Sequence, residues 1–392
     1  MATPLDHNPT THLDETPFTV PVYPQLPFEP VAGDGVYLLD RVGRRVLDMY
    51  GGHAVSSLGY GHPRLTAAIC EQAQRLLFQS NVVPLDIRAR AAAALTAFAP
   101  PGLDRVFLVN SGAEANENAL RIACRRTGRE RVVALEGGFH GRSAACSAVT
   151  WGAAERWYGF PRMPFEVSFV SRDDPAALAD AMGADVAAVI IEPIQGVAGA
   201  VDISHEYLRA ARSLSTTHGS LLIFDEVQCG VGRSGYPFAA DAAGVTPDLL
   251  TTAKGLAGGL PAGAVIMTDA IADELGSGEL GTTFGGGPLA CAAIEAVIAA
   301  IRETHLLGNV RRLSARLQEE CVTGPVTSVQ GGGFLLGLRT TRPAAGIRDA
   351  LLERDILTGT SADPCVLRLL PPLVLADSHV DQLVEALTEI QP

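Results

Sequence analysis

The middle of the chain alternates short apolar runs with longer helix-forming stretches, and this alternation constrains the fold more than any other feature. Arg105–Val109 and Arg131–Leu135 have the length and composition of strands, and Ala113–Arg126 between them is a predicted helix. Strands connected through helices are typical of a mainly parallel sheet covered by helices on both faces. We therefore predict an α/β protein built on one large, mainly parallel sheet.

Two further apolar runs end in acidic residues. Ala187–Ile191 precedes Glu192, and Leu221–Phe224 precedes Asp225. In open α/β sheets, ligands bind in a crevice outside the carboxyl ends of the strands. We therefore expect Glu192, Asp225 and the turn Ser111–Ala113 to converge on a single crevice.

The composition disfavours nucleic-acid, membrane and metal-binding classes. The chain has 392 residues, of which 47% are hydrophobic and 19% charged, and a formal charge of −13 that disfavours contact with a phosphate backbone. The most apolar stretch, Leu289–Ile301, contains Glu295 and is short for a bilayer span. Seven cysteines without a CxxC pair disfavour disulfides and metal clusters, so we expect a cytoplasmic protein without bound metal.

The chain divides into four predicted regions. Residues 1–30 have no basic segment followed by an apolar one, so we expect an N-terminal arm and not a secretory signal. Residues 31–60, with a predicted hairpin over Asp34–Asp48, join the small domain. Residues 61–288 form the large domain, and residues 289–392 form a smaller C-terminal α+β domain that begins with a long helix.

The pairing of Lys254 with Asp225 indicates a chemistry. A lysine amine can hold an aldehyde cofactor as an imine, and a carboxylate at the end of a strand can keep a pyridine nitrogen protonated, which makes the ring an electron sink. Pyridoxal 5′-phosphate needs both groups. We therefore predict a pyridoxal-phosphate enzyme in which Lys254 and Asp225 are catalytic. The alternative class is a nucleotide-binding regulatory module or a dehydrogenase, but residues 105–126 contain no GxGxxG motif.

The turn that opens the predicted helix has two interpretations, an ordinary helix cap and a phosphate site. Ser111 can cap the helix, while the small residues Gly112 and Ala113 let backbone N–H groups approach an anion. Phe139 and Val227 are candidates to cover the two faces of a flat cofactor. The neighbouring polar residues of the same helix are expected to serve the helix itself: Glu114, Asn116 and Glu117.

The ordered motifs resemble those of the class III pyridoxal-phosphate-dependent aminotransferases. They extend over nearly the whole chain after the arm and are, in chain order, Ser111–Glu117, Phe139–Arg142, Glu192–Gly196, Asp225–Gln228, Lys254–Gly255, Thr282–Gly286 and Leu367–Leu373. The resemblance implies the fold-type I architecture and a homodimer whose active sites lie at the subunit interface. It also implies an amine donor and 2-oxoglutarate or glutamate as small-molecule partners.

The resemblance assigns cofactor contacts residue by residue. It implies that Gln228 binds the phenolic oxygen, that Glu192 supports the Gln228 side, and that Thr283 of the partner subunit contacts the phosphate. The other implied contacts agree with those expected from the residues: Ser111, Gly112, Ala113, Phe139, Asp225, Val227 and Lys254.

The resemblance also implies a ping-pong reaction in which Lys254 moves a proton between substrate and cofactor. Arg142, whose guanidinium fork suits a carboxylate, would bind the donor, Thr282 would lie beside the substrate, and Arg368 would bind the α-carboxylate of 2-oxoglutarate. The expected donor is the terminal amine of N2-acetyl-L-ornithine or a related N-blocked ornithine or lysine, in arginine biosynthesis. The alternative is a 4-aminobutyrate or other ω-amino acid transaminase.

Two positions depart from the family pattern. Many members carry a glutamate after the Glu-Pro-Ile-Gln-Gly motif that pairs with the arginine matching Arg368, but this chain has Val197 there. Either Arg368 is more hydrated, another acid replaces the glutamate, or a substrate carboxylate occupies the site. His53 lies in a segment that borders the substrate tunnel in the family, and it is either a donor contact or a structural histidine.

Overall fold

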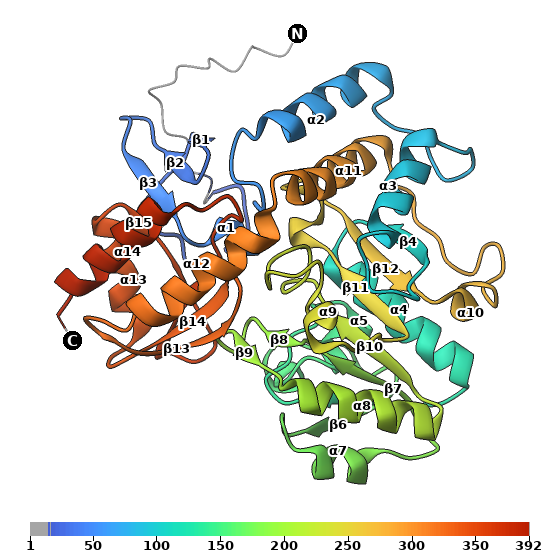
Figure 1. Ribbon diagram of the computed structural model, residues 1–392. Coiled ribbons are helices and arrows are strands. Elements are labelled where there is room, and N and C mark those ends of the chain that lie inside the picture. The colour runs from blue at the N-terminus through green and yellow to red at the C-terminus, as the bar shows by residue number, and fades with distance from the viewer. Residues whose placement is uncertain (1–14, 16, 392) are drawn as a thin grey trace.

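A seven-stranded sheet forms the centre of the molecule and confirms the α/β prediction (Figure 1). The computed structural model describes residue 15 and residues 17–391, so the predicted arm over residues 1–30 lies partly outside the described residues. All neighbouring strands are parallel except β12, which is antiparallel to both of its neighbours. The strand order is β4 (Arg105–Val109), β12 (Gly263–Met267), β11 (Leu249–Thr252), β10 (Leu221–Asp225), β7 (Val186–Ile191), β5 (Arg131–Leu135) and β6 (Glu166–Val170).

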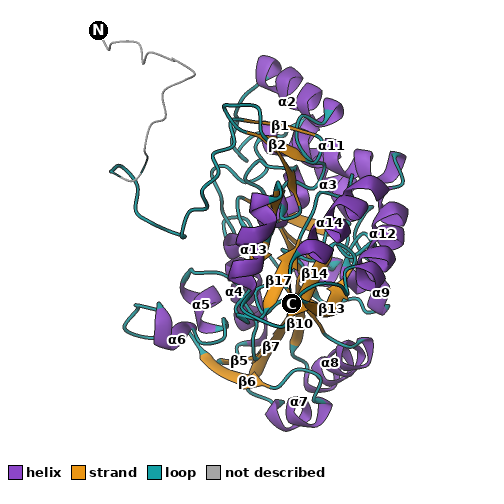
Figure 2. Ribbon diagram, turned by 90° about the vertical axis from the view of Figure 1, so that its left-hand side faces the viewer, coloured by secondary structure: helices purple, strands orange, loops and turns teal. Residues whose placement is uncertain are grey.

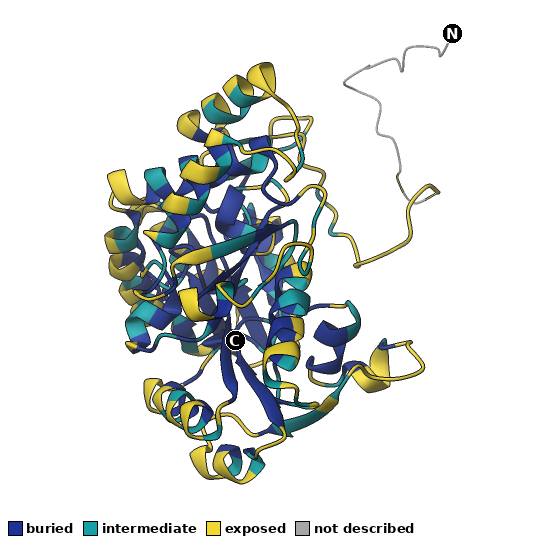
Figure 3. Ribbon diagram, turned by 90° about the vertical axis from the view of Figure 1, so that its right-hand side faces the viewer, coloured by how far each residue is buried: buried dark blue, intermediate teal, exposed yellow. Residues whose placement is uncertain are grey.

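Helices cover both faces of this sheet because successive side chains of a strand point to opposite faces. Leu221 and Ile223 of β10 pack on the face covered by α4 (Gly112–Thr127) and α5 (Ala144–Ala148). Leu222 and Phe224 pack on the other face, with α3 (Asp86–Thr96), α7 (Pro175–Ala181), α8 (His205–His218) and α11 (Pro288–Glu303). Figure 2 shows α4 and α5 on one side of the strands and α7 and α8 on the other. Figure 3 shows the buried strands between helices whose outer surfaces are exposed.

The helix predicted over Ala113–Arg126 is present and extends one residue further at each end, from Gly112 to Thr127. The Ser111 hydroxyl accepts a hydrogen bond from the Glu114 N–H at 3.1 Å and so caps α4. The helix ends at Gly128, whose φ of 65° lies in the left-handed region that glycine adopts without a steric cost. The Ser111 cap holds the N-terminus of α4 next to the end of β4.

Besides the two-stranded pair β8–β9 (Ile194–Gln195 and Val201–Asp202), two four-stranded sheets lie beside the large one. The C-terminal sheet has the order β13 (Val326–Gly332), β14 (Leu335–Thr340), β17 (Val366–Leu369) and β16 (Gly359–Thr360), with helices α12 (Leu306–Glu320), α13 (Ala344–Glu353) and α14 (Asp377–Glu389). The other sheet contains β1 (Ala32–Asp34), β2 (Tyr37–Leu39), β3 (Arg45–Asp48) and β15 (Ile356–Leu357). The predicted hairpin is therefore part of a three-stranded meander that also pairs with a C-terminal strand.

The remaining elements are short, apart from α2. They are α1 (Gly51–Ala54), α2 (Pro63–Arg75), α6 (Ala153–Arg156), β8 (Ile194–Gln195), β9 (Val201–Asp202), α9 (Ala239–Ala243), the 3₁₀ helix η1 (Lys254–Ala257) and α10 (Asp269–Ala272). Within the described residues, none of the helices has both the length and the apolar character that crossing a bilayer requires. The predicted division into four regions stays a prediction, and its boundary at residue 289 falls inside α11.

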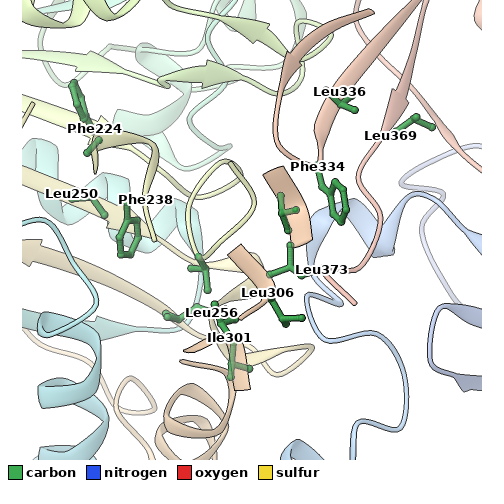
Figure 4. Packing of buried hydrophobic residues seen from close by; sticks show 14 of the residues in the cluster. Phe224, Phe238, Leu250, Leu256, Ile301, Leu306, Phe334, Leu336, Leu369 and Leu373 are labelled. Atoms are coloured by element: carbon green, nitrogen blue, oxygen red, sulfur yellow. The ribbon is translucent and has the colours of Figure 1, made fainter. Parts of the chain in front are cut away.

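One continuous apolar cluster joins the large sheet to the C-terminal sheet (Figure 4). Phe224 and Leu250 belong to the large sheet, and Leu336 and Leu369 belong to the C-terminal one. Residues between the sheets connect the two ends of the cluster: Leu256, Ile301, Leu306, Phe334 and Leu373. Because close-packed interiors deform little, this shared core fixes residues from both parts of the chain relative to each other.

Candidate active site

A cavity of about 450 Å³ lies at the carboxyl ends of the parallel strands. Its lining contains every residue predicted to be catalytic or to bind the cofactor except Thr283, and it also contains Arg142. The predicted residues in the lining are Ser111, Gly112, Ala113, Phe139, Glu192, Asp225, Val227, Gln228 and Lys254. The expected crevice therefore exists, and residues that are far apart in the sequence meet in it.

Asp225 is the last residue of β10 and is held by three hydrogen bonds. Its Oδ2 accepts one from the Asn116 amide at 2.7 Å and one from His140 Nδ1 at 2.7 Å. Its Oδ1 accepts one from the Val227 N–H at 3.0 Å. Glu226, the next residue, caps α9 by accepting from the N–H groups of Ala239 and Ala240. Because successive side chains at the strand end point to opposite sides, Asp225 and not Glu226 points into the cavity.

Two titratable groups next to Asp225 have shifted pKa values. Burial alone would lower the pKa of His140, but the hydrogen bond to Asp225 and the charges of Asp225 and Glu192 raise it overall. Burial and then the charge of Asp225 raise the pKa of Glu192 to about 7, although the Phe139 and Gly196 N–H groups donate to its oxygens. His140 Nδ1 therefore stays protonated and donates to Asp225 Oδ2, and this hydrogen bond supports the negative charge of Asp225.

Lys254 stands close to Asp225 because β11 lies next to β10 in parallel. Thr251 pairs with Asp225 across the two strands, and Lys254 begins η1 just beyond the end of β11. Burial lowers the pKa of the Lys254 amine, while the carboxylates of Asp225 and Glu192 oppose this shift. A lower pKa increases the neutral fraction of the amine, which is the form that attacks an aldehyde.

The backbone of Lys254 is also strained. Its φ of 44° lies in the left-handed region that residues with a side chain rarely adopt. Such a residue costs on the order of 1–3 kcal/mol, and it persists only where the surrounding structure holds it. Here the following residues of η1, Gly255 to Ala257, are buried and anchor the turn.

The N-terminus of α4 opens onto the cavity through Gly112 and Ala113. A Cβ on Gly112 would approach Val227 Cγ1 to 2.6 Å, so only glycine lets Val227 lie against this helix end. The first N–H groups of a helix have no partner within the helix and favour an anion. The structure therefore supports both interpretations of the turn, because Ser111 caps the helix while the next two residues face the cavity.

The residues around the cavity fit pyridoxal phosphate. Gln228 Oε1 is buried without a hydrogen-bond partner among the described residues. It occupies the space that a Cβ on residue 196 would need, which glycine leaves free. Buried polar groups normally have a partner, so an amide at this position calls for a polar group from a ligand. A helix N-terminus for a phosphate, a carboxylate for a pyridinium and a buried amine for an aldehyde complete the donor set.

The described part of the N-terminal arm contacts Arg142, which lines the cavity. Arg142 donates a hydrogen bond to the Tyr23 hydroxyl at 3.3 Å, and its guanidinium lies 5.3 Å from the ring centre of Trp157. Phe139 lies next to Arg142 and 6.4 Å from the Trp157 ring. Arg142 is exposed, so its guanidinium remains accessible to a substrate carboxylate.

The last three predicted site residues lie outside the lining of the cavity: Thr282, Thr283 and Arg368. The Thr282 hydroxyl accepts hydrogen bonds from the Gly285 N–H and from the amide of Asn110, which does line the cavity. Thr283 is exposed. Their predicted contacts to substrate and phosphate stay predictions, and in the case of Thr283 the prediction needs a partner subunit.

Arg368 is buried, with 6% of its surface exposed, which excludes the expectation of a more hydrated guanidinium. Within the described residues no carboxylate forms an ion pair with it. Instead it donates to the Tyr50 hydroxyl at 2.8 Å, to the Thr360 carbonyl at 2.7 Å and to the Gly196 carbonyl at 3.1 Å. The Tyr50 hydroxyl is a neutral hydrogen-bond acceptor, so it does not supply the replacement acid that the sequence suggested.

His53 lies between two tyrosines and does not line the cavity. Its ring centre is 4.8 Å from that of Tyr50 and 5.6 Å from that of Tyr23. Burial, followed by the charges of Arg368 and Lys254, lowers its pKa to about 4, so the imidazole is neutral at neutral pH. The structural interpretation of His53 therefore has the stronger support.

Three features of the site were missed by reasoning from the sequence. Asn116 was expected to stabilise its own helix. Because Asn116 faces the sheet, its amide N–H donates to Asp225, and its amide oxygen accepts from the Thr251 hydroxyl at 2.6 Å. Position 116 follows Gly112 by four residues and therefore shares its helix face, which could have indicated this role. His140 was not singled out either. Lys254 is also the only lysine in the chain, a signal that the composition already contained.

Over residues 15 and 17–391, no group of three or more His, Cys, Asp or Glu side chains is placed to hold a metal ion. Cys229 is buried next to the site, and burial raises the pKa of its thiol well above the usual range. A thiol in that form is a poor nucleophile and a poor metal ligand.

Comparison with known proteins gives matches over nearly the whole chain. The model of the family described as aminotransferase class-III matches residues 20–390. An acetylornithine aminotransferase of Streptomyces coelicolor is 44% identical over 373 residues, which are 94% of this chain and 91% of that protein. One of Methanothermobacter thermautotrophicus is 36% identical and covers 96% of this chain and 97% of its own.

Solved structures agree with these matches. The ornithine aminotransferase of Toxoplasma gondii, whose structure was described with partial occupancy of pyridoxal phosphate, superposes with a TM-score of 0.89 at 28% identity, over 96% of this chain and 93% of that one. A transaminase from the marine bacterium Virgibacillus superposes with a TM-score of 0.86 at 25% identity, over 92% and 91% of the two chains. The shared fold extends from the large sheet into the C-terminal sheet.

Proposed function

This chain belongs to the class-III aminotransferases, and from that premise we propose that it transfers the terminal amine of N2-acetyl-L-ornithine, or of a related N-blocked ornithine or lysine, to 2-oxoglutarate. The products are the semialdehyde and L-glutamate. The observation that carries the proposal is the cavity in which Lys254 and Asp225 meet the N-terminus of α4 and Arg142. The names of the relatives support the donor, and we propose that the reaction belongs to arginine biosynthesis.

The residues of the cavity would hold pyridoxal phosphate in one orientation. Asp225, fixed by Asn116 and His140, would keep the pyridine nitrogen protonated. The N–H groups at the start of α4 would bind the phosphate. Phe139 and Val227 would cover the two ring faces. Gln228, supported by Glu192, would contact the phenolic oxygen. When bound, the cofactor supplies an electron sink for the carbon that bears the amine.

Lys254 would transfer the proton, and Arg142 and Arg368 would bind the substrate carboxylates. The Lys254 amine would take the proton from the carbon that bears the donor amine and return it to the cofactor side, because its lowered pKa leaves it free to accept a proton. Arg142 would bind the donor α-carboxylate and so direct the terminal amine, not the blocked one, towards Lys254. Arg368 would bind the α-carboxylate of 2-oxoglutarate.

We also propose that two chains form a homodimer with shared sites, in the cytoplasm. An exposed apolar patch supports the dimer: Leu77 (63% exposed), Phe78 (41%), Val82 (89%) and Phe284 (65%). The rings of Phe78 and Phe284 are 5.3 Å apart, and Phe284 directly follows Thr283. Apolar patches of this kind mark protein interfaces. Light scattering should give the mass of two chains, and Phe284→Asp should shift it towards one chain; a wild-type mass of one chain would refute the dimer.

The donor can be tested against the alternative function by comparing amines that do and do not carry an α-carboxylate. With 2-oxoglutarate in excess, N2-acetyl-L-ornithine should give glutamate with a kcat/KM at least about 10²-fold above that of 4-aminobutyrate. Its α-carboxylate is one carbon farther from the terminal amine than the carboxylate of 4-aminobutyrate is, so that Arg142 would hold the carboxylate while the amine reaches Lys254. Comparable values for the two amines would instead favour an ω-amino acid transaminase. Glutamate formation is measured with a coupled dehydrogenase.

A further inference from the structure

The direction of the Lys254 amine depends on the backbone turn that carries it. Lys254 has a φ of 44°, a left-handed conformation that a residue with a side chain keeps only where its surroundings hold it. The residue begins η1, and the next three residues of this short helix are buried. A 3₁₀ helix has poorer hydrogen-bond geometry than an α-helix, so it adds little rigidity of its own. Contacts from other parts of the chain must therefore hold the turn.

Ser57 provides such a contact. Its Oγ donates a hydrogen bond to the Gly255 carbonyl at 2.9 Å, and only 1% of the Ser57 surface is exposed. Within residues 15 and 17–391, it is the one side chain that donates to a backbone carbonyl of η1. A second donor to the same carbonyl, the Gly258 N–H, lies farther away at 3.3 Å. A Cβ on Gly255 would come within 3.3 Å of the Ser57 Cβ, so glycine lets the turn lie directly against Ser57.

Ser57 is itself held by the C-terminal part of the chain. The Leu373 N–H donates to the Ser57 carbonyl at 2.8 Å. Leu373 and Leu256, the latter in η1, lie in the apolar cluster that joins the two sheets (Figure 4). The Ser57 hydroxyl therefore binds the lysine turn from a position that the close-packed core fixes. Ser57 was not singled out from the sequence, because 198 positions separate it from Gly255.

We propose that Ser57 is a positioning residue for the Lys254 amine. Its hydroxyl holds the Gly255 carbonyl and so keeps the strained backbone of Lys254 in the conformation that places the amine in the cavity. Ser57 does not belong to the lining of the cavity, so it acts through Lys254 and not on a substrate. This inference rests on the proposed function only for the role of Lys254, and it holds for any amine donor.

Ser57→Ala tests this inference, because it removes the hydroxyl and adds no atom. In the first measurement, cofactor-free, full-length protein is mixed with pyridoxal phosphate, and the visible band of the lysine-bound cofactor is followed. The band should form more than about threefold more slowly than in wild type, as expected when one hydrogen bond that orients the reacting amine is lost. The second measurement is steady-state kinetics with N2-acetyl-L-ornithine and 2-oxoglutarate. There kcat should fall by more than about threefold, and both KM values should change by less than kcat does.

Ser220→Ala is the matched control. Ser220 is also buried, with 3% of its surface exposed, and its hydroxyl donates to the Val186 carbonyl at 2.8 Å. It directly precedes β10, at the opposite end of that strand from Asp225. The control variant should lose a similar amount of stability in thermal melting, and it should keep both rates within about threefold of wild type.

A Ser57→Ala variant in which either rate falls by less than about threefold would overturn the inference. A Ser220→Ala variant that is slowed as much as Ser57→Ala would also overturn it, because the effect would then follow stability and not the position of Lys254. So would a change in KM larger than the change in kcat, because it would place Ser57 at the substrate. If the band forms with the predicted dependence on Ser57 but wild type converts no amine donor, the proposed function is refuted and the role of Ser57 stands.

Discussion

Lys254→Ala should reduce turnover at least about 10⁴-fold, because the same amine binds the cofactor aldehyde and moves the proton. No other side chain can replace it, since Lys254 is the only lysine in the chain. The variant should fold normally, because the substitution removes a buried amine whose charged form burial disfavours. Steady-state glutamate formation measures the loss of turnover, and the visible absorption of the cofactor-loaded protein measures the loss of the bond between lysine and cofactor.

Lys254→Arg is the matched control for charge. An arginine restores a permanent cation at this position, but it is not deprotonated in proteins and so cannot bind the aldehyde or accept the proton. It should be as inactive as Lys254→Ala. Substantial turnover in either variant, with melting temperatures close to that of wild type, would remove Lys254 from the catalytic role.

Asp225→Asn should lower kcat by about 10²–10³-fold while the protein still binds the cofactor at Lys254. The carboxylate is a preorganised charge next to the ring nitrogen, and removing one such group from an active site typically has an effect of this size. The amide also mismatches its neighbours, because both carboxylate oxygens accept hydrogen bonds from Asn116, His140 and Val227. Single-turnover kinetics with saturating donor separate the chemical step from binding.

Asp248→Asn controls for the loss of a carboxylate that contacts the same strand. Asp248 Oδ2 accepts hydrogen bonds from the Leu222 N–H at 2.7 Å and from Arg212 at 2.9 Å, at the opposite end of β10 from the cavity. Its asparagine variant should lose some stability and keep kcat within about twofold. If Asp225→Asn also keeps kcat near the wild-type value, the pyridinium role of Asp225 is wrong.

The central part of the site could be predicted from the sequence because it follows from strand ends. Asp225 and Glu192 directly follow buried apolar runs, and the carboxyl ends of parallel strands meet at one edge of a sheet. The turn before α4 carries its own capping signal in Ser111. For these residues a local pattern determines the position, and the structure places them where the pattern indicated.

Other contacts could not be predicted because no local pattern encodes them. Tyr50 and Arg368 are 318 residues apart in the sequence and meet only through the pairing of β16 with β17 and the turn after Asp48. That turn is left-handed: Gly51, Gly52, His53 and Ala54 all have positive φ values. Two of the four have side chains, so propensity alone disfavours this conformation. Tertiary contacts determine it, and with it the environment of Arg368.

The most direct test of the account is the first half of the reaction on its own. Purified, cofactor-loaded protein is mixed with N2-acetyl-L-ornithine in the absence of any keto acid, and the visible absorption of the lysine-bound cofactor is followed. The account predicts that this band disappears as the amine is transferred, and that 2-oxoglutarate then restores it with release of glutamate. A band that stays unchanged with the donor would contradict the proposed donor, and cofactor-saturated protein that never shows the band would contradict an aminotransferase site at Lys254.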